Sequence, residues 1–288
     1  LRGAGRGFCS GLDLREQTGG GATVRPSVSA SLRGQHKIAE LVTKTESHER
    51  IQILKQSVIV DHSGMAGAFK TGVQVGPQMF YRQIKHGITI LATGALPNRP
   101  AEYLLGRHPA VTTQLDLEAI LEEHPEQVQT WQNVVMIQCV GSRTPDNPNC
   151  SRICCQAAIK NALRIGEIND QVRIMVLYRD LRTPGFEEDY YRLARQRGVI
   201  FAPYEPEHKP VAVAQDGKVA VTFTDPVLGR DLVVPADCLV LSTGMVADDE
   251  STEDLGTIFR LPRTRDSYFL EDHIKLRPVD LPVPGFFV

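Results

Sequence analysis

The chain has 288 residues, of which 42% are hydrophobic and 23% are charged, and its formal net charge is −2. This composition is ordinary for a globular protein of about two domains, and the charge gives no reason to expect binding to nucleic acid or an anionic membrane. No stretch approaches the ~18 consecutive apolar residues of a membrane span, and no signal peptide is evident. We therefore expect a cytoplasmic protein, in which clustered cysteines indicate metal or redox chemistry rather than a disulfide framework.

Residues 1–35 are rich in glycine and serine and lack hydrophobic periodicity, which predicts an irregular or degenerate N-terminal segment. Gly3–Gly7 has the spacing that opens a dinucleotide-binding loop, but Phe8 stands where the third glycine of G-x-G-x-x-G belongs. Cys9 is far from the other cysteines in the sequence, and a free thiol is its default interpretation.

The next segment, 36–112, predicts a helix and several short strands. Ile38, Leu41 and Val42 share one face of a helix over 36–47. A small β-meander is predicted from apolar stretches at 51–54, 58–60 and 73–75. Residues 87–94 predict a buried strand that ends in a turn at Thr93 and Gly94.

From residue 113 the pattern becomes that of a nucleotide-binding fold. Thr113 is a plausible N-cap, with Asp116 at position N3 of the following helix. Strands and helices then alternate at 134–137, 154–165, 172–178, 187–197 and 199–202. Gly198 is expected to end the last of these helices. This β-α-β-α-β order predicts a parallel sheet with right-handed crossovers.

Antiparallel strands follow, and the chain then returns to the sheet. Alternating apolar residues predict strands at 211–213, 219–223 and 232–234, with a hairpin signal at Asp216 and Gly217. Residues 238–241 predict a buried strand that ends at Ser242, Thr243 and Gly244. Cys238 lies within this apolar stretch and is expected in the core.

Four of the six cysteines occur between the strand at 134–137 and the helix that follows it, namely Cys139, Cys150, Cys154 and Cys155. In doubly wound folds a glycine-rich turn at this place grips a dinucleotide phosphate. Here thiols replace the glycines, so we interpret the turn as a nucleotide site converted to a metal-cluster site.

Four interpretations of these thiols compete. Buried structural cysteine would not explain four thiols at one turn. Structural zinc prefers separated ligand pairs, whereas the spacing here is C-x10-C-x3-C-C and the loop has no histidine. An iron–sulfur cluster accepts neighbouring thiolates on different irons, and a helix N-terminus favours its negative charge. A vicinal disulfide between Cys154 and Cys155 is a minor alternative, because it would strain the backbone.

Several strings around these cysteines resemble the flavin-containing A subunit of heterodisulfide reductase. The resemblance covers roughly residues 33–288 and rests on ATGALPNRPAEYLLG, VTTQLDLE, CVGSR, CSRICC, AIK, DPVLGRDLVVPADCLVLSTGMV and HIKLRPVDLPVPGFF, in that order. It implies an α/β fold of two dinucleotide-binding-like, thioredoxin-reductase-like domains with parallel sheets, small antiparallel inserts and an incomplete N-terminal part. It further implies FAD, a [4Fe–4S] cluster on the four cysteines, and electron transfer within a larger complex of several chains.

The same resemblance suggests a division of the chain. Residues 36–112 would form a partial FAD-binding domain, 113–244 a nucleotide-domain-like region carrying the cluster, and 245–288 the return to the FAD domain. Compared with the family, both ends look cut, and a C-x2-C-x2-C-x3-C run is absent. We therefore expect a fragment or the product of an incomplete gene.

The resemblance also implies roles for individual residues. FAD would lie against Thr93–Gly94 and Ser242–Gly244, and Lys160 on the cluster helix would face the flavin and tune its potential. A solvated surface lysine is the alternative. Arg143 and Arg152 flank the cluster thiols and could offset the charge of the cluster or form solvated ion pairs. A second basic set could approach the flavin or a partner subunit, namely His273, Lys275 and Arg277.

The predicted function is electron transfer through FAD and the cluster to heterodisulfide- or ferredoxin-reducing partners. The implied partners are other heterodisulfide reductase subunits, a hydrogenase- or formate-dehydrogenase-type donor, and ferredoxin. One alternative is a zinc-stabilised interaction module. Another is a nicotinamide-dependent disulfide reductase using Cys154 and Cys155, although no G-x-G-x-x-G follows the strand at 134–137. No histidine lies in a pattern typical of hydrolytic enzymes.

Overall fold

The computed structural model describes residues 9–10 and 35–288. Within these residues the chain forms two compact units, the first containing His36–Leu96 and Val246–Val288 and the second containing Pro97–Met245. The chain passes between the units along two short strands, β6 (Leu96–Pro97) and β15 (Met245–Val246), which form a two-stranded sheet. The domain boundaries expected from the sequence, at residues 35, 112 and 244, stay predictions.

The second unit is built on a five-stranded sheet in the order β10-β9-β8-β14-β7. Its strands are β7 (Val111–Thr113), β8 (Asn133–Ile137), β9 (Arg173–Tyr178), β10 (Ile200–Pro203) and β14 (Cys238–Leu241). All neighbouring strands are parallel. The predicted α/β class with a parallel sheet is confirmed.

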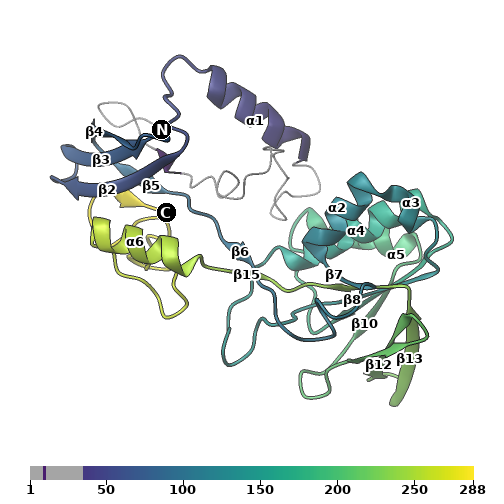
Figure 1. Cartoon of the computed structure of the whole chain (residues 1–288). Helices are drawn as coiled ribbons and strands as arrows, with labels where there is room; N and C mark the ends of the chain where they lie inside the picture. The colour runs from purple at the N-terminus through teal and green to yellow at the C-terminus, as the bar shows by residue number, and fades with distance from the viewer. Residues whose placement is uncertain (1–8, 11–34) are drawn as a thin grey trace. The chain divides into compact units, whose positions relative to one another are not determined.

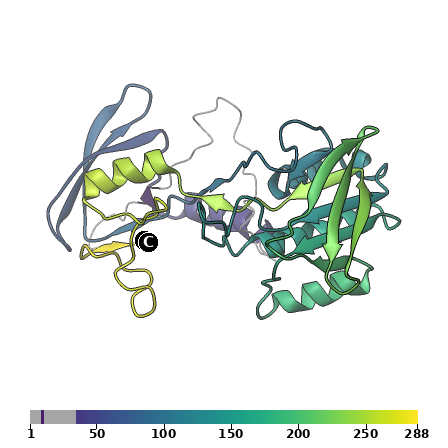
Figure 2. The same ribbon diagram turned by 90° about the horizontal axis from the view of Figure 1, so that it is seen from below.

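Both faces of this sheet are covered, as expected for a parallel sheet. Val134 and Met136 of β8 face the helices α2 (Gln114–Glu123), α3 (Pro125–Val128), α4 (Cys154–Ile168) and α5 (Glu187–Gln196). Val135 and Ile137 belong to the cluster on the opposite face, which the three-stranded antiparallel sheet covers (Figures 1 and 2). All five residues of β8 are buried, so the strand before the cysteines is the rigid centre of the unit.

The antiparallel sheet has the order β11 (Val211–Gln215), β12 (Lys218–Asp225) and β13 (Arg230–Ala236). Asp216 and Gly217 connect β11 to β12, with φ of 49° and 78°. Positive φ at both positions is typical of a type I′ turn, so the predicted hairpin is confirmed. Cys238 in β14 is 4% exposed, which confirms it as a core residue.

Helix α2 begins as predicted. The Thr113 hydroxyl accepts a hydrogen bond from the Asp116 amide at 3.2 Å and donates one to the Asp116 carboxylate at 2.9 Å. This reciprocal arrangement satisfies an amide that the helix itself leaves unpaired. Gly198 follows the C-cap residue Arg197 of α5 and has φ of +86°, a conformation that glycine adopts without strain.

The first unit contains a short parallel sheet and a longer antiparallel one. A three-stranded parallel sheet contains β1 (Cys9–Ser10), β5 (Thr89–Leu91) and β16 (Phe286–Phe287), with β5 in the centre. An antiparallel sheet contains β2 (Ser57–Ser63), β3 (Phe69–Val75) and β4 (Phe80–His86). It includes the strands predicted at 58–60 and 73–75, whereas β4 was not predicted. The helices are α1 (Gln35–Ser47) and α6 (Asp249–Phe259). The core joins Ile59, Phe69 and Leu91 to α6 and β16.

Some sequence predictions differ from the structure. The strand predicted at 51–54 is wrong; Ile51 and Ile53 are 38% and 44% exposed, so this stretch has no buried face to support pairing. The predicted helix at 36–47 forms, but Leu41 is 50% exposed. The irregular N-terminal segment contains the short strand β1, while Gly3–Gly7 lies outside the described residues.

In the described part of the chain, no helix combines the length and apolarity that a membrane crossing requires.

Candidate functional site

The cysteine loop crosses the carboxyl edge of the parallel sheet in the second unit. The Gln138 amide donates to the Leu177 carbonyl of β9 at 2.9 Å, and the Val140 amide donates to the Ser242 carbonyl at 3.0 Å. Cys139 therefore lies where the ends of β8, β9 and β14 meet, as the carboxyl ends of parallel strands do. Cys154 is the first residue of α4, so the loop connects the buried strand to the amino end of this helix.

The backbone that carries the first thiol adopts a strained conformation. Cys139 and Arg143 have φ of +60° and +56°, in the left-handed region that residues with a Cβ rarely occupy. Gly141 between them has φ of +61°, and a Cβ there would lie 2.8 Å from the side chains of Asn98 and Pro100. Such strain persists only where the surroundings impose it, and it is typical of functional loops.

Burial dominates the electrostatics of three thiols. Desolvation raises the pKa of Cys154 to about 12 and that of Cys155 to about 11, and the negative charges of the neighbouring thiolates add to both shifts. Burial also raises the pKa of Cys139, although Arg143 opposes the shift. Cys150 contributes to the shifts of the other three. The four predicted ligands are therefore close enough to perturb one another, and their thiolate forms need a cation to stabilise them.

The amino end of α4 adds a further favourable feature. The N-cap position is Ile153, whose side chain makes no capping hydrogen bond. Backbone amides in the first turn of a helix carry partial positive charge and favour anions. Gly244 and Arg182 also supply backbone hydrogen bonds that lower the pKa of Cys154 and Cys155, respectively.

Charged residues from the cysteine loop and from the loop after β9 lie beside the thiols. Arg143 forms an ion pair with Asp180 and lies 3.8 Å from Cys139, measured from Nη1 to Sγ. Arg179 donates to the Arg143 carbonyl at 2.9 Å, and Arg182 pairs with Asp180 at 3.1 Å. Residues 179–182 were not predicted as part of the site, although their position directly after a strand parallel to β8 was an available signal. Of the two predicted arginines, Arg143 contacts a thiol and Arg152 is exposed.

The described residues hold no group of three or more His, Cys, Asp or Glu side chains that could bind one metal ion. A zinc site needs its sulfurs about 2.3 Å from a single centre, so the geometry adds no support for the zinc alternative. A cluster accepts thiolates around a larger volume, because its irons are separate. Four partly or fully buried thiols with cationic neighbours fit such a group in donor type and charge. All four are free, and no vicinal disulfide joins Cys154 to Cys155.

The strand-end residues Ser242, Thr243 and Gly244 lie beside the thiols. They line a pocket in the second unit together with Thr113, Gln114, Leu115, Ile153 and Cys154. Gly244 has φ of +76°, and a Cβ there would lie 2.9 Å from the Ser151 hydroxyl. The buried Ser242 hydroxyl has no hydrogen-bond partner. This turn therefore presents a close-approaching backbone and an unused polar group, which suits contact with a ligand.

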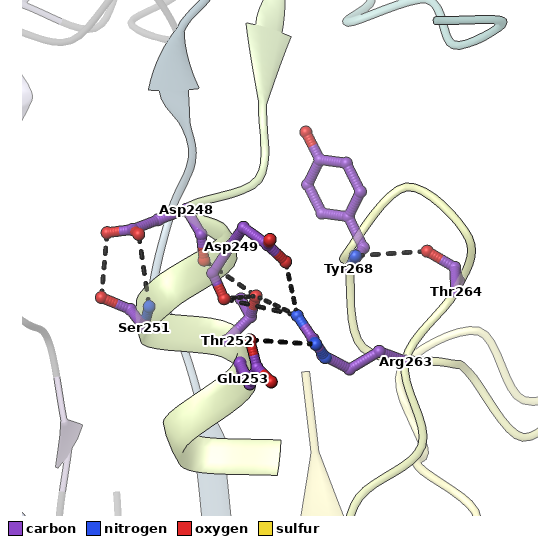
Figure 3. Close-up of polar contacts among 8 residues, drawn as sticks. All are labelled: Asp248, Asp249, Ser251, Thr252, Glu253, Arg263, Thr264 and Tyr268. Carbon is purple, nitrogen blue, oxygen red and sulfur yellow. Dashed lines mark hydrogen bonds and ion pairs between the residues drawn. The ribbon is translucent and has the colours of Figure 1, made fainter. Parts of the chain in front are cut away.

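Thr93 and Gly94 belong to the first unit, where they line a separate pocket with Thr252, Tyr268 and Glu271. Figure 3 shows how the neighbouring segment is held: Arg263 contacts the Asp249 carboxylate at 2.7 Å, and the Tyr268 amide donates to the Thr264 hydroxyl at 3.2 Å. Asp248 caps α6 by accepting a hydrogen bond from the Ser251 amide. The contact of one FAD with both strand ends stays a prediction.

Lys160 is not a surface residue. Its side chain is 12% exposed, and Nζ lies 2.5 Å from Oε1 of Glu118 on α2. Burial raises the pKa of Glu118, although the pairing with Lys160 opposes this shift. The surface-lysine alternative is therefore wrong, and the predicted role of Lys160 beside a flavin is untested. Among the other basic residues, Arg277 pairs with Asp272 and Asp280 of its own segment.

Comparison with known proteins identifies relatives of the chain, although no family model matches it. It is 34% identical over 221 residues to the A subunit of the ferredoxin:CoB-CoM heterodisulfide reductase of Methanosarcina mazei, covering 72% of this chain and 28% of that protein. It is 33% identical over 208 residues to the second iron-sulfur A subunit of the CoB–CoM heterodisulfide reductase of Methanopyrus kandleri, covering 67% and 31%. It is 32% identical over 222 residues to the A subunit of the H2:CoB-CoM heterodisulfide,ferredoxin reductase of Methanothermobacter thermautotrophicus, covering 72% and 33%. The chain thus spans a third or less of the length of these relatives.

Solved structures agree on the fold. Thioredoxin reductase of T. acidophilum is 14% identical, with a TM-score of 0.50 over 88% of this chain and 70% of that one. The FAD-bound cadaverine monooxygenase DfoA of Erwinia amylovora is 8% identical, with a TM-score of 0.53 over 84% and 63%. These likenesses confirm the thioredoxin-reductase-like fold. Over about 70% of its length, the chain belongs to the family of heterodisulfide reductase A subunits, which are oxidoreductases.

Proposed function

We propose that the chain transfers electrons through an iron–sulfur cluster bound by Cys139, Cys150, Cys154 and Cys155. The observation that carries this proposal is the convergence of four thiols at the carboxyl edge of the parallel sheet, beside Arg143 and the amino end of α4. The Methanopyrus relative is named as an iron-sulfur protein, which supports the same cofactor. We propose a [4Fe–4S] cluster, as the family resemblance implies.

When bound, such a cluster supplies one-electron redox chemistry. The residues of this chain would contribute the rest. The thiolates hold the cluster, and Arg143 and the first amides of α4 offset its negative charge. Burial of Cys155, which is 7% exposed, limits access of water to the sulfur. Because burial favours the protonated thiols, cluster binding must displace protons.

FAD is the second proposed cofactor. Its proposed contacts are the turns Thr93–Gly94 and Ser242–Gly244, each of which follows a buried strand and lines a pocket within its own unit. Lys160 is proposed to act on the flavin from α4, where its charge is already balanced by Glu118. A cation beside reduced flavin stabilises the anionic form.

The proposed partners follow from the relatives, whose names mention ferredoxin, H2 and formate. They are other heterodisulfide reductase subunits, a hydrogenase- or formate-dehydrogenase-type electron donor, and ferredoxin. Reduction of the heterodisulfide is proposed to occur on a different chain of the complex. The same proposal includes a cytoplasmic location.

The test begins with anaerobic purification and measurement of iron, acid-labile sulfide and zinc. We expect iron and sulfide in equal amounts with broad visible absorption. Cys154→Ala should remove most of the iron, whereas the matched change Cys238→Ala in the core should retain it. Stoichiometric zinc without sulfide would reject the cluster and favour the zinc-stabilised module. Anaerobic titration with FAD tests the flavin separately, since absence of binding by cluster-loaded protein would reject the flavin proposal alone.

A further inference from the structure

A set of ion pairs and hydrogen bonds from neighbouring residues lies beside two of the proposed cluster ligands. At one end, Nη1 of Arg143 lies 3.8 Å from Sγ of Cys139. The same guanidinium pairs with Oδ1 of Asp180, and Oδ2 of Asp180 accepts from Nε and Nη2 of Arg182 at 3.2 and 3.1 Å. At the other end, the Arg182 backbone donates a hydrogen bond to the Cys155 thiol.

These charged residues are held close to the parallel sheet. Arg179, Asp180 and Arg182 follow directly after β9, whose last residue is Tyr178. Arg179 holds the Arg143 carbonyl at 2.9 Å, and its Nε is buried without a hydrogen-bond partner. The Arg143 side chain is 20% exposed, against 46% for Asp180. Arg143 is therefore the more shielded of the two, and solvent screens its charge less than that of Asp180.

Arg143 also differs from an ordinary surface cation in its backbone. Its φ of +56° turns the chain so that its side chain returns toward Cys139, four residues earlier. Left-handed φ is unfavourable for a residue with a Cβ. The strained turn is consistent with a functional role for the guanidinium, which lies between Cys139 and Asp180.

We propose that Arg143, oriented by Asp180, sets the redox potential of the cluster. This inference rests on the proposed function. Reduction adds one electron to the cluster and increases its negative charge, without forming a bond in the protein. A cation and N–H donor at a ligand sulfur stabilises the reduced form more than the oxidised form, so it raises the potential. The carboxylate of Asp180 acts in the opposite direction while it fixes the guanidinium in place.

The test is an anaerobic reductive titration with dithionite, followed by electron paramagnetic resonance of the reduced cluster. Arg143→Gln should lower the potential, so that the ratio of reduced to oxidised cluster at a fixed poise falls about tenfold, or about 59 mV for one electron. Asp180→Asn removes a negative charge but keeps a side-chain oxygen that can accept the hydrogen bond from Arg143, so the guanidinium stays in place and the potential should rise. Arg164→Gln on α4 is the matched control, because Arg164 is exposed and paired with Glu167, and the potential of this variant should equal that of the wild type.

The outcomes separate the two proposals. Iron and sulfide are measured first in every variant. Arg143→Lys serves as a second variant, which keeps the positive charge and should have a cluster potential close to that of the wild type. A full complement of cluster with an unchanged potential in Arg143→Gln would reject the tuning role alone. Shifts of the same sign in Arg143→Gln and Asp180→Asn would also reject it, since they would report disturbance of the loop rather than charge. Absence of a cluster from the wild-type protein would reject both proposals.

Discussion

The two compact units solve the problem of a stable core in different ways. The second unit buries aliphatic side chains on both faces of one parallel sheet, with Leu239, Val240 and Leu241 essentially inaccessible. The first unit has strands of two to seven residues and depends on an aromatic cluster around Phe286. A sheet that is buried on both faces gives the four thiols a rigid edge, whereas the core of the first unit depends on contacts between large aromatic side chains.

Polar groups inside the two units differ as well. In the first unit, His86 Nδ1 donates to the Ile88 carbonyl at 2.9 Å, so a neutral His86 must accept the Thr71 hydroxyl at Nε2. The Thr71 oxygen then accepts from Nδ1 of His62 at 2.9 Å. In the second unit, buried polar groups instead secure the strand ends, as Asp237 does for the amides of Gln132 and Asn133.

The largest loss of stability is expected when the aromatic cluster of the first unit is disrupted. Phe286 is 1% exposed, and its ring centroid lies 5.1 to 5.3 Å from those of Phe259, Phe69 and His62. Phe286→Ala should destabilise the first unit by about 3–5 kcal/mol. Hydrogen exchange read by mass spectrometry should show lost protection in β5 and retained protection in β9. The control Phe80→Ala, at a residue 67% exposed, should cost less than about 0.5 kcal/mol. Equal loss in β5 and β9 would contradict the independence of the two cores.

A smaller loss of stability is expected when Asp237 is changed, because its carboxylate braces a strand end of the second unit through the amides of Gln132 and Asn133. Burial would raise the pKa of Asp237, but hydrogen bonds from Lys218 and the Asn133 and Gln132 amides outweigh it and lower this pKa. Asp237→Asn should lower the free energy of unfolding by about 2 kcal/mol at pH 7, as expected for charge-assisted hydrogen bonds.

The pH dependence of this effect has a definite sign. A lowered pKa in the folded state gives stability that is complete above the unfolded value of about 3.9 and is lost as the pH falls through the folded value. The difference between wild type and Asp237→Asn should therefore shrink in urea titrations performed below about pH 4. A difference that stays constant at acidic pH would mean that charge has no part in the brace.

The smallest effect concerns the histidine chain of the first unit. Burial and the nearby His86 lower the pKa of His62, against the opposing effect of Asp61. Because the unfolded chain then binds the proton more readily, the first unit should lose stability as the pH falls below about 6.5. Urea titrations between pH 8 and 5.5 would measure this. His62→Gln should flatten the profile, whereas His208→Gln at an exposed position of the second unit should leave it unchanged. An unaltered slope in His62→Gln would exclude His62 as the source.

Local patterns in the sequence determined much of the fold. The Thr113 cap, the Asp216–Gly217 hairpin and the alternation of strands and helices depend on neighbouring residues, and each was predictable from them. The placement of Cys139 after a buried strand and of Cys154 at the start of a helix was predictable for the same reason. The stretch at 51–54 shows the limit, since apolar alternation without a partner surface does not make a strand.

Contacts between residues far apart in the sequence could not be predicted from local patterns. Arg143 and Asp180 are 37 residues apart, and Lys160 and Glu118 are 42 apart. No local periodicity encodes such pairs, because they depend on strand order and on the register of β8 against β9. The positive φ of Cys139 also escapes sequence reasoning, since the surrounding packing imposes it against the local preference of the residue. The sequence therefore identified the candidate thiol ligands, because their placement depends on local strand and helix patterns. The packing of the sheet brought the charged residues Arg143 and Asp180 together beside them.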